Sequence, residues 1–271
     1  MIDQTLTLPQ VNTSMPGSAR RSRKFKLLLL ALEFIRAGIL LRWQFRGLQR
    51  EQKLQAIQRW AKQVLRILEI EVHCNQGSDS NFAGLVVSNH LSWLDILVIQ
   101  SVMPGVFVAK TEVGKWPLIG AMAHSCATIF VDRATARSAH AMVDSTVAAF
   151  AQRYSVIAFP EGTSTDGSDL ARFHANVFEG AIRAQAPVQP VSLRYVDANT
   201  GLPASSAHFT GDMTLLSSLR KVTACSSITT QVQLGQRICS SGHTRKSLCQ
   251  QTHQVIRAQL LASSPEREKN Y

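Results

Sequence analysis

The sequence lacks the features of several common protein classes. Its five cysteines are an odd number without a Cys-x-x-Cys pair, which argues against a disulfide framework or a thiolate zinc site and favours a reducing compartment. Apolar residues make up 45% of the chain and charged residues only 17%, which excludes a mainly disordered protein. Aromatic residues are scarce at 7% and we find no nucleic-acid-binding motif, so little is available for stacking on bases.

The N-terminal part of the chain also lacks an uninterrupted apolar run. A basic cluster at residues 20–26 leads directly into the apolar segment 27–32, which Glu33 and Arg36 then interrupt. A membrane-spanning helix needs about 20 mostly apolar residues, and no small-residue cleavage site follows, so this is neither a clean span nor a clean secretory signal. The spacing of Glu33 and Arg36 predicts an ion pair on one face of a helix.

Positive charge is concentrated in the same region. Residues 1–70 contain 13 Lys and Arg and 4 Asp and Glu, so they carry +9 of the formal net charge of +11. Such a surface suits an anionic partner, either nucleic acid or lipid headgroups. Residues 54–68 repeat apolar side chains at helical spacing with cations around the rest of the helix. We expect residues 20–70 to form a basic amphipathic membrane anchor, although an ordinary helical pair packed on the body would show the same pattern.

The rest of the chain predicts an α/β domain over residues 71–263, between a disordered tail at 1–19 and a polar C-terminal tail at 264–271. Apolar strands that alternate with helical segments imply crossover connections, and hence a mostly parallel central sheet flanked by helices. The expected strands are 85–87, 106–109, 127–131, 156–159, 188–195 and 227–234, and the expected helices are 93–103, 135–152, 176–185 and 244–262.

A candidate general base lies between the first of these strands and the helix after it. Ser92 and Asp95 have the S-x-x-D spacing of a capping box, which predicts Ser92 as the N-cap of that helix. His90 and Asp95 could then meet across the turn, where the positive helix end disfavours a charged imidazolium. Asp95 would hold one ring nitrogen and leave the other free to take a proton from a substrate hydroxyl. The plain alternative is a surface histidine beside a helix cap.

A second cluster, residues 159–165, follows the fourth expected strand. Open α/β sheets bind ligands at the C-terminal ends of their strands. There Gly162 permits close backbone approach and Thr163 offers a hydroxyl and an amide, so the turn could bind an anion or a developing oxyanion. A plain Pro-Gly turn is the alternative.

Two cations and an apolar turn complete the set of candidates. Lys110 and Arg133 each follow an apolar strand and could bind a phosphate or carboxylate, although such cations are often merely solvated. The turn from Trp116 to Gly120, which includes Pro117, could line an acyl groove or pack in the core.

Together these motifs resemble those of the glycerolipid acyltransferase family, of the lysophosphatidic acid acyltransferase type. The family's N-H-x-x-x-x-D block is matched by Asn89, His90 and Asp95, and its F-P-E-G-T block by residues 159–163. The remaining matches, which include a W-P-x-x-G-like turn and an F-x-x-R block, are Lys110, Trp116, Pro117, Gly120, Phe130, Arg133 and the strand with a central proline at 188–191. The matches run in order over residues 85–195, about two-fifths of the chain.

The resemblance implies an enzyme held peripherally or monotopically at the cytoplasmic face of a membrane, with lysolipid, bilayer and acyl donor as partners and no nucleic acid. It would transfer a fatty acyl group from acyl-CoA or acyl carrier protein to a lysolipid hydroxyl. His90, oriented by Asp95, would deprotonate the hydroxyl; neither metal nor cofactor is required. The residues implied for oxyanion stabilisation or acceptor binding are Lys110, Arg133, Glu161, Gly162 and Thr163. Of these, Lys110 and the Gly162 amide are the candidates for oxyanion stabilisation. The residues implied for an acyl groove are Trp93, Trp116 and Pro117.

One departure from the family pattern leaves the acceptor open. Ser164 stands where lysophosphatidate enzymes usually carry an Arg near the acceptor phosphate, and the exchange removes a bidentate donor. The Thr/Ser-rich variant with Asp166-Gly167 is similar to lyso-ornithine lipid acyltransferases, whose acceptor headgroup has no phosphate, while Arg172 could restore a cation. The acceptor is therefore 1-acylglycerol-3-phosphate or lyso-ornithine lipid. The competing functions are an acyl thioesterase, in which the same pair activates water, and a basic nucleic-acid-binding protein.

Overall fold

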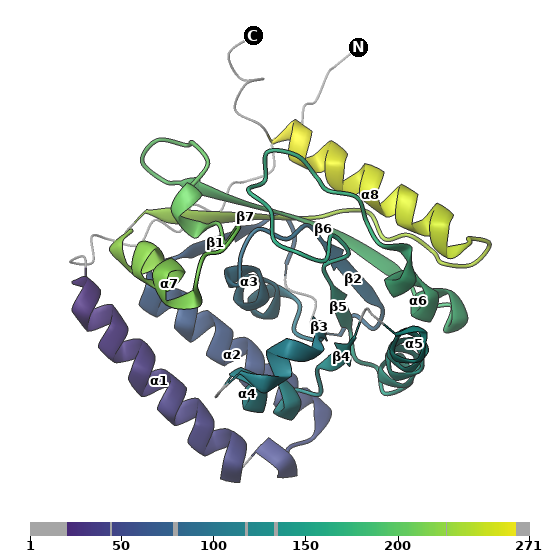
Figure 1. Ribbon diagram of the computed structural model, residues 1–271, viewed down its shortest axis with the longest axis horizontal. Helices are drawn as coiled ribbons and strands as arrows, with labels where there is room; N and C mark the ends of the chain where they lie inside the picture. Colours follow the sequence, from purple (N-terminus) through teal and green to yellow (C-terminus); the bar gives the residue numbers. More distant parts are fainter. Residues whose placement is uncertain are drawn as a thin grey trace, which may run out of the picture.

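The computed structural model describes residues 21–43, 45–77, 81–116, 119–132, 135–225 and 227–263. Within these residues seven strands form one sheet in the order β1-β7-β6-β2-β5-β3-β4 (Figure 1). Their bounds are β1 Glu71–Cys74, β2 Leu85–Ser88, β3 Val106–Lys110, β4 Ile129–Val131, β5 Val156–Ala158, β6 Val188–Asp197 and β7 Ile228–Leu234. Every neighbouring pair is parallel except β6 and β7. The predicted α/β class with a mostly parallel sheet is confirmed.

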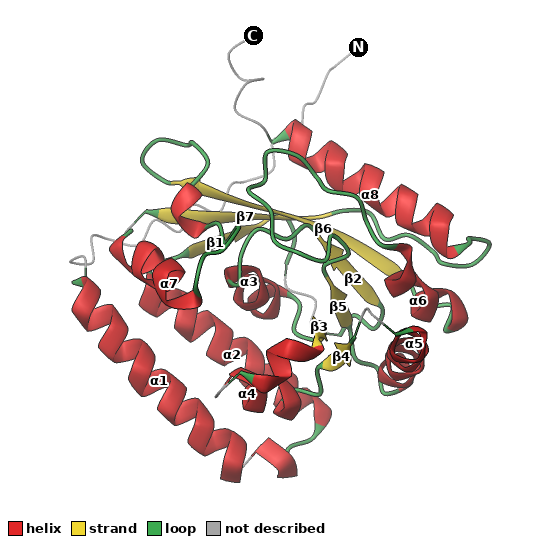
Figure 2. Cartoon of the chain, in the orientation of Figure 1, coloured by secondary structure: helices red, strands yellow, loops and turns green. Residues whose placement is uncertain are grey.

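Helices cover both faces of this sheet (Figure 2). They are α1 Arg23–Trp43, α2 Arg50–Leu68, α3 Leu94–Val102, α4 Ile119–Ser125, α5 Ala136–Ala151, α6 Glu179–Arg183, α7 Leu215–Ala224 and α8 Arg245–Ala262. Val86 of β2 belongs to an apolar cluster with α2, α3 and α7, while Leu85 and Val87 belong to a second cluster with α5, α6 and α8. Strands buried on both faces have near-continuous apolar sequences, which explains why β2 was easy to recognise.

The expected strands and helices after residue 85 are all present, with shifted ends. The strand expected at 127–131 begins at Ile129, because Ala127 has a left-handed φ of 56°. Among the described strands and α-helices, three were not predicted: β1 at one edge of the sheet, α4 and α7. All five cysteines lie among the described residues and none forms a disulfide. The predicted tails at 1–19 and 264–271 lie outside the described residues.

The two predicted N-terminal helices differ in how they pack. The apolar side of α2 is buried against the body and shares the cluster of α3 and the sheet; its buried residues are Leu54, Ala61, Val64, Leu65, Ile67 and Leu68. The outer side of α1 instead leaves large apolar side chains 46–80% exposed, namely Phe25, Leu28, Leu32, Ile35, Ile39 and Trp43. Of these two helices, α1 is therefore the one that presents an apolar surface to its surroundings.

A buried lysine fastens α1 to the body. Lys26, part of the basic cluster in the sequence, is 1% exposed; its Nζ lies 2.8 Å from Oε2 of Glu69 and donates to the carbonyls of Leu68 and Cys225. The predicted Glu33–Arg36 pair is confirmed, with 3.0 Å between Arg36 Nε and Glu33 Oε2. Among the described residues, no helix combines the length and apolar character needed to cross a bilayer.

Candidate active site

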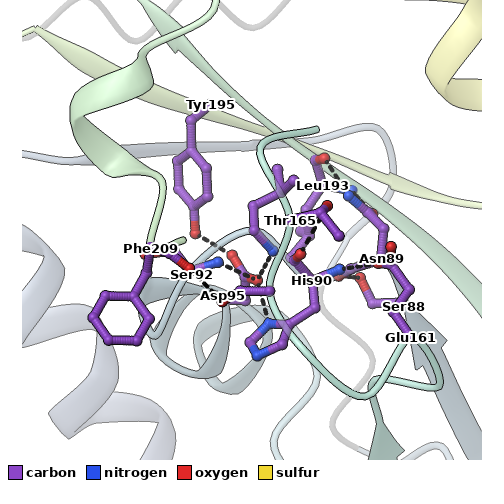
Figure 3. A network of polar contacts seen from close by, with 12 residues as sticks. Ser88, Asn89, His90, Ser92, Asp95, Glu161, Thr165, Leu193, Tyr195 and Phe209 are labelled. Atoms are coloured by element: carbon purple, nitrogen blue, oxygen red, sulfur yellow. Dashed lines mark hydrogen bonds and ion pairs between the residues drawn. The ribbon is translucent and has the colours of Figure 1, made fainter. Parts of the chain in front are cut away.

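The predicted contact between His90 and Asp95 is present at the C-terminal edge of the sheet (Figure 3). His90 lies in the loop that follows β2, and Asp95 is the second residue of α3. Nδ1 of His90 is 2.8 Å from Oδ2 of Asp95. The carboxylate is completely buried, whereas the imidazole is 20% exposed. The ring is therefore held from the interior and remains accessible from outside.

Four donors surround the Asp95 carboxylate. Oδ2 accepts hydrogen bonds from His90 Nδ1 and from the backbone N–H groups of Leu91 at 2.7 Å and Ser92 at 2.9 Å. Oδ1 accepts a bond from the hydroxyl of Tyr195 at 2.7 Å. Because a carboxylate only accepts, its bond with Nδ1 places the imidazole hydrogen there and leaves Nε2 with a free lone pair. This is the tautomer that a general base requires.

The predicted role of Ser92 as N-cap is wrong. Helix α3 begins at Leu94 with Trp93 as its N-cap, and the buried Ser92 Oγ has no hydrogen-bond partner among the described residues. Asp95 supplies the other half of the predicted box, since its carboxylate accepts the Ser92 N–H. The chain thus wraps around the carboxylate, which brings Asp95 to the imidazole of His90.

The second motif packs directly against the first. The ring of Phe159 stacks on the ring of His90, with centroids 4.1 Å apart and 12° between the planes. Glu161 accepts the backbone N–H of His90 at Oε1, 2.7 Å away, and that of Ala171 at Oε2, 3.0 Å away. The Thr165 N–H donates to the carbonyl of His90 at 2.8 Å. The two motifs therefore hold the His90 backbone from both sides.

Glu161 is a brace in this arrangement. Its side chain is buried and each carboxylate oxygen accepts one backbone N–H, so Glu161 joins the His90 loop to the segment at Ala171. Burial is the largest effect on its carboxyl and raises the pKa above the ordinary value of 4.5, while the two N–H donors act in the opposite direction.

The predicted oxyanion donors are less well placed. Gly162 has a φ of 79°, which favours glycine, but its N–H donates to the Phe159 carbonyl at 3.1 Å and closes the turn. In this structure the Gly162 hydrogen thus takes part in the turn, and a role of this amide towards an oxyanion stays a prediction. Thr163 is exposed next to it. Lys110 is exposed at the end of β3, on the same edge of the sheet as His90. Arg133 lies outside the described residues.

The two acyl-groove candidates that the structure describes, Trp93 and Trp116, have different surroundings. Trp93 packs into the core and donates its Nε1–H to Ser218 Oγ of α7 at 2.9 Å. Trp116 is 43% exposed after the 3₁₀ turn Thr111–Lys115, and Pro117 lies outside the described residues. Among the described residues, no group of three or more His, Cys, Asp or Glu side chains is arranged to hold a metal ion.

Two residues of the site, Leu193 and Tyr195, come from β6, and neither was assigned a role from the sequence. Asn89 exchanges two hydrogen bonds with the backbone of Leu193, from Nδ2 to the carbonyl at 3.0 Å and from the Leu193 N–H to Oδ1 at 2.8 Å. Tyr195 follows two residues later and reaches Asp95, 100 positions away in the sequence. No local pattern marks such a tyrosine, so only the folded chain reveals it.

Comparison with known proteins points to one family. The model of the Acyltransferase family matches residues 69–194. The lyso-ornithine lipid O-acyltransferase of Pseudomonas aeruginosa is 32% identical over 206 residues, which are 76% of this chain and 78% of that protein. The 1-acyl-sn-glycerol-3-phosphate acyltransferase of Neisseria meningitidis is 33% identical over 148 residues, which are 54% of this chain and 58% of that protein.

A solved structure has the same fold. The crystal structure of the 1-acyl-sn-glycerophosphate acyltransferase PlsC from Thermotoga maritima aligns with a TM-score of 0.61 over 92% of this chain and 98% of its own, at 21% identity. The segment matched by the family model includes the strand-to-helix turn with His90 and Asp95. The chain therefore belongs to the acyltransferase family.

Proposed function

We propose that the protein transfers a fatty acyl group from an acyl thioester to the free hydroxyl of a lysolipid at a membrane surface. The observation that carries the proposal is the 2.8 Å contact between His90 Nδ1 and the buried Asp95, with the opposite edge of a partly exposed ring left to face a substrate. This pair supplies a base and its orienting carboxylate, and the acceptor hydroxyl takes the place of a protein nucleophile.

The reaction begins when Nε2 of His90 removes the proton of the acceptor hydroxyl as its oxygen attacks the thioester carbonyl. A C–O bond forms, and the carbonyl oxygen becomes the oxyanion of a tetrahedral intermediate. The negative charge of Asp95 stabilises the imidazolium during this step. The intermediate then collapses with cleavage of the C–S bond, and the imidazolium returns its proton to the departing thiolate. Every proton is accounted for by His90, so the chemistry needs neither a metal nor a cofactor.

Lyso-ornithine lipid is the acceptor that the local geometry favours. The Ser164 hydroxyl donates to the carbonyl of Phe209, whose own N–H donates to the carbonyl of Leu91 at 2.8 Å. The side chain at position 164 is thus turned toward the 208–209 segment and brings no positive charge to the His90 loop. A phosphate headgroup would lack the bidentate partner that an arginine offers there. The name of the Pseudomonas relative agrees with this choice.

The acyl donor is either acyl-CoA or acyl carrier protein, and the enzyme docks on the cytoplasmic face of a membrane through α1. The exposed apolar side chains of α1 and its exposed cations Arg23, Lys24 and Arg42 support this docking, since apolar burial and attraction to anionic headgroups both favour an interfacial helix. The thioesterase alternative would use the same base on water, and the acceptor assay separates the two.

The test is an acceptor screen with a radiolabelled acyl donor. The purified protein is given lyso-ornithine lipid, lysophosphatidate or buffer alone, with acyl-CoA and acyl carrier protein compared as donors. We expect label in the diacylated ornithine lipid and little free fatty acid. Preference for lysophosphatidate would overturn the choice of acceptor, and release of free fatty acid without transfer would establish the thioesterase instead.

Replacing Ser164 tests the acceptor argument more finely. Ser164→Arg restores a bidentate phosphate partner, so the ratio of kcat/KM for lysophosphatidate over lyso-ornithine lipid should rise about tenfold or more. Ser164→Ala is the matched control, because it removes the hydroxyl without adding charge and should leave the ratio unchanged. An unchanged ratio in Ser164→Arg would mean that position 164 does not read the headgroup.

A further inference from the structure

We propose that Tyr195 is a positioning residue of this active site. Its hydrogen bond fixes the orientation of the Asp95 carboxylate and withdraws part of its negative charge, and thereby sets how readily His90 takes up a proton. The proposal rests on the acyl transfer proposed above and adds a residue from a distant strand to it. Figure 3 shows Asp95 between the His90 ring and the Tyr195 phenol.

The contact is specific to one oxygen of the carboxylate. Tyr195 donates to Oδ1 at 2.7 Å, whereas the imidazole and two backbone N–H groups all donate to Oδ2. Both partners are shielded from water, since Asp95 is 0% and Tyr195 1% exposed. In such surroundings a carboxylate oxygen without a donor is costly, so the phenol is the group that lets Oδ1 stay charged inside the core.

The fold positions this hydroxyl accurately. β6 lies beside β2, with Val191 opposite Ser88, and the two bonds between Asn89 and Leu193 continue the pairing past the end of β2. Residues two apart in a strand share a face, so Tyr195 stands on the same side of β6 as Leu193. The residue adjacent to His90 therefore fixes the strand that delivers the phenol to Asp95.

Tyr195 acts only as a donor under working conditions. Burial is the largest effect on its hydroxyl and, with the charge of Asp95 and the bond between them, raises the pKa well above the ordinary value of 10.0. Among the described residues, other titratable side chains that interact electrostatically with Asp95 include His90, Glu161 and the half-buried His208. Of these groups, only Tyr195 contacts the oxygen that faces away from the imidazole.

For catalysis, the negative charge of Asp95 is shared between the Tyr195 hydroxyl and the His90 imidazole. A phenol that donates to Oδ1 withdraws part of the negative charge that Asp95 would otherwise direct at the imidazole. Without it, the imidazolium would be stabilised more strongly, and a smaller fraction of His90 would be in the unprotonated form that can accept a proton at acidic pH. The carboxylate would also lose the contact that fixes its rotation, so the ring would be aimed less well.

Tyr195→Phe tests the proposal, because it removes one oxygen and keeps the ring. We expect kcat for acyl transfer to fall about tenfold to a hundredfold, as for other groups that orient a functional histidine. The KM for lysolipid should stay unchanged, and the acidic limb of the pH profile of kcat/KM should move to higher pH. Tyr154→Phe is the matched control; Tyr154 lies beside Arg50, and its variant should behave like the unmodified protein.

Three outcomes would overturn the role of Tyr195. Unchanged kcat and an unchanged pH profile would show that the hydroxyl is dispensable. A lower kcat without a shift of the acidic limb would show a structural role alone. If Tyr195→Phe does not fold, 3-fluorotyrosine at the same position keeps the shape and is a stronger donor; it should move the limb to lower pH, and an unmoved limb would contradict the proposal. Failure of the unmodified protein to transfer acyl groups would instead contradict the proposed function itself.

Discussion

At the scale of single residues, two buried carboxylates hold different parts of His90. Asp95 binds the imidazole and the first turn of the loop, and Glu161 binds the backbone N–H of His90 itself. The ring is thereby fixed through its side chain and its main chain at once. This arrangement holds the base in place before a substrate arrives, which reduces the reorganisation needed during the reaction.

The buried brace gives a pH dependence of stability. Because burial raises the pKa of Glu161, the native state holds this proton more tightly than the unfolded chain, whose value is near 4.5. The stability that Glu161 contributes is therefore complete below that value and is lost as pH rises through the raised native pKa. We predict that the unfolding free energy of the protein minus that of Glu161→Gln becomes smaller as pH rises above about 4.5.

Urea unfolding between acidic and neutral pH measures this difference. Glu112→Gln, at an exposed glutamate, provides the control and should show no such trend. A difference between the protein and Glu161→Gln that stays constant with pH would contradict the assignment of Glu161 as a buried brace with a raised pKa.

Residues could be predicted where partners are close in the chain. His90 and Asp95 lie within one turn, so their spacing was enough to place them together. The bond from the Gly162 amide to the Phe159 carbonyl was not predicted, because a sequence does not show which carbonyl a turn closes on. Tyr195 was missed because its contact depends on β6 lying beside β2, a pairing that no local signal encodes.

At the scale of elements, α1 and α2 were expected to act together but pack differently. α2 has its apolar side chains at helical spacing and buries them in the core, whereas α1 leaves a large part of its apolar surface exposed. The alternative of a packed helical pair thus describes α2, and the proposed membrane docking rests on α1.

A charge placed on the outer side of α1 tests the docking. Leu32 is 54% exposed, and Leu32→Glu replaces an apolar contact worth about 1.5–3 kcal/mol when fully buried. We expect partitioning into vesicles of phosphatidylcholine and phosphatidylglycerol to weaken about tenfold or more, measured by co-sedimentation.

Leu261→Glu on α8 is the matched control, since Leu261 is 51% exposed on a helix of the opposite face of the sheet. It should bind vesicles like the unmodified protein. Equal binding by both variants would contradict a docking role for α1.

The elements that escaped prediction share a weak pattern. β1 is four residues long at the edge of the sheet, and its side chains are exposed or half-buried, so it lacks the apolar run of a central strand. α4 and α7 are short and carry many small or polar residues. Their formation depends on tertiary packing, which outweighs local propensity in such segments.

At the scale of the whole molecule, alternation of apolar strands and helices was sufficient to predict the α/β class. The order of strands was not predicted, because the pairing of β6 with β2 and β7 joins segments that are far apart in the chain. That order determines function: it places the loop after β2, the turn after β5 and the end of β6 at one edge of the sheet, where His90, Glu161 and Tyr195 meet Asp95 or its loop.

The most direct test of the account is the turnover of His90→Ala with lysolipid and a labelled acyl thioester. Loss of the base should lower kcat about 10²–10⁴-fold. The thermal unfolding temperature of the variant, measured alongside, shows whether it remains folded. His243→Ala, which removes a partly exposed imidazole before α8, should retain full turnover. Transfer by His90→Ala at a rate near that of the unmodified protein would show that the reaction does not depend on this histidine.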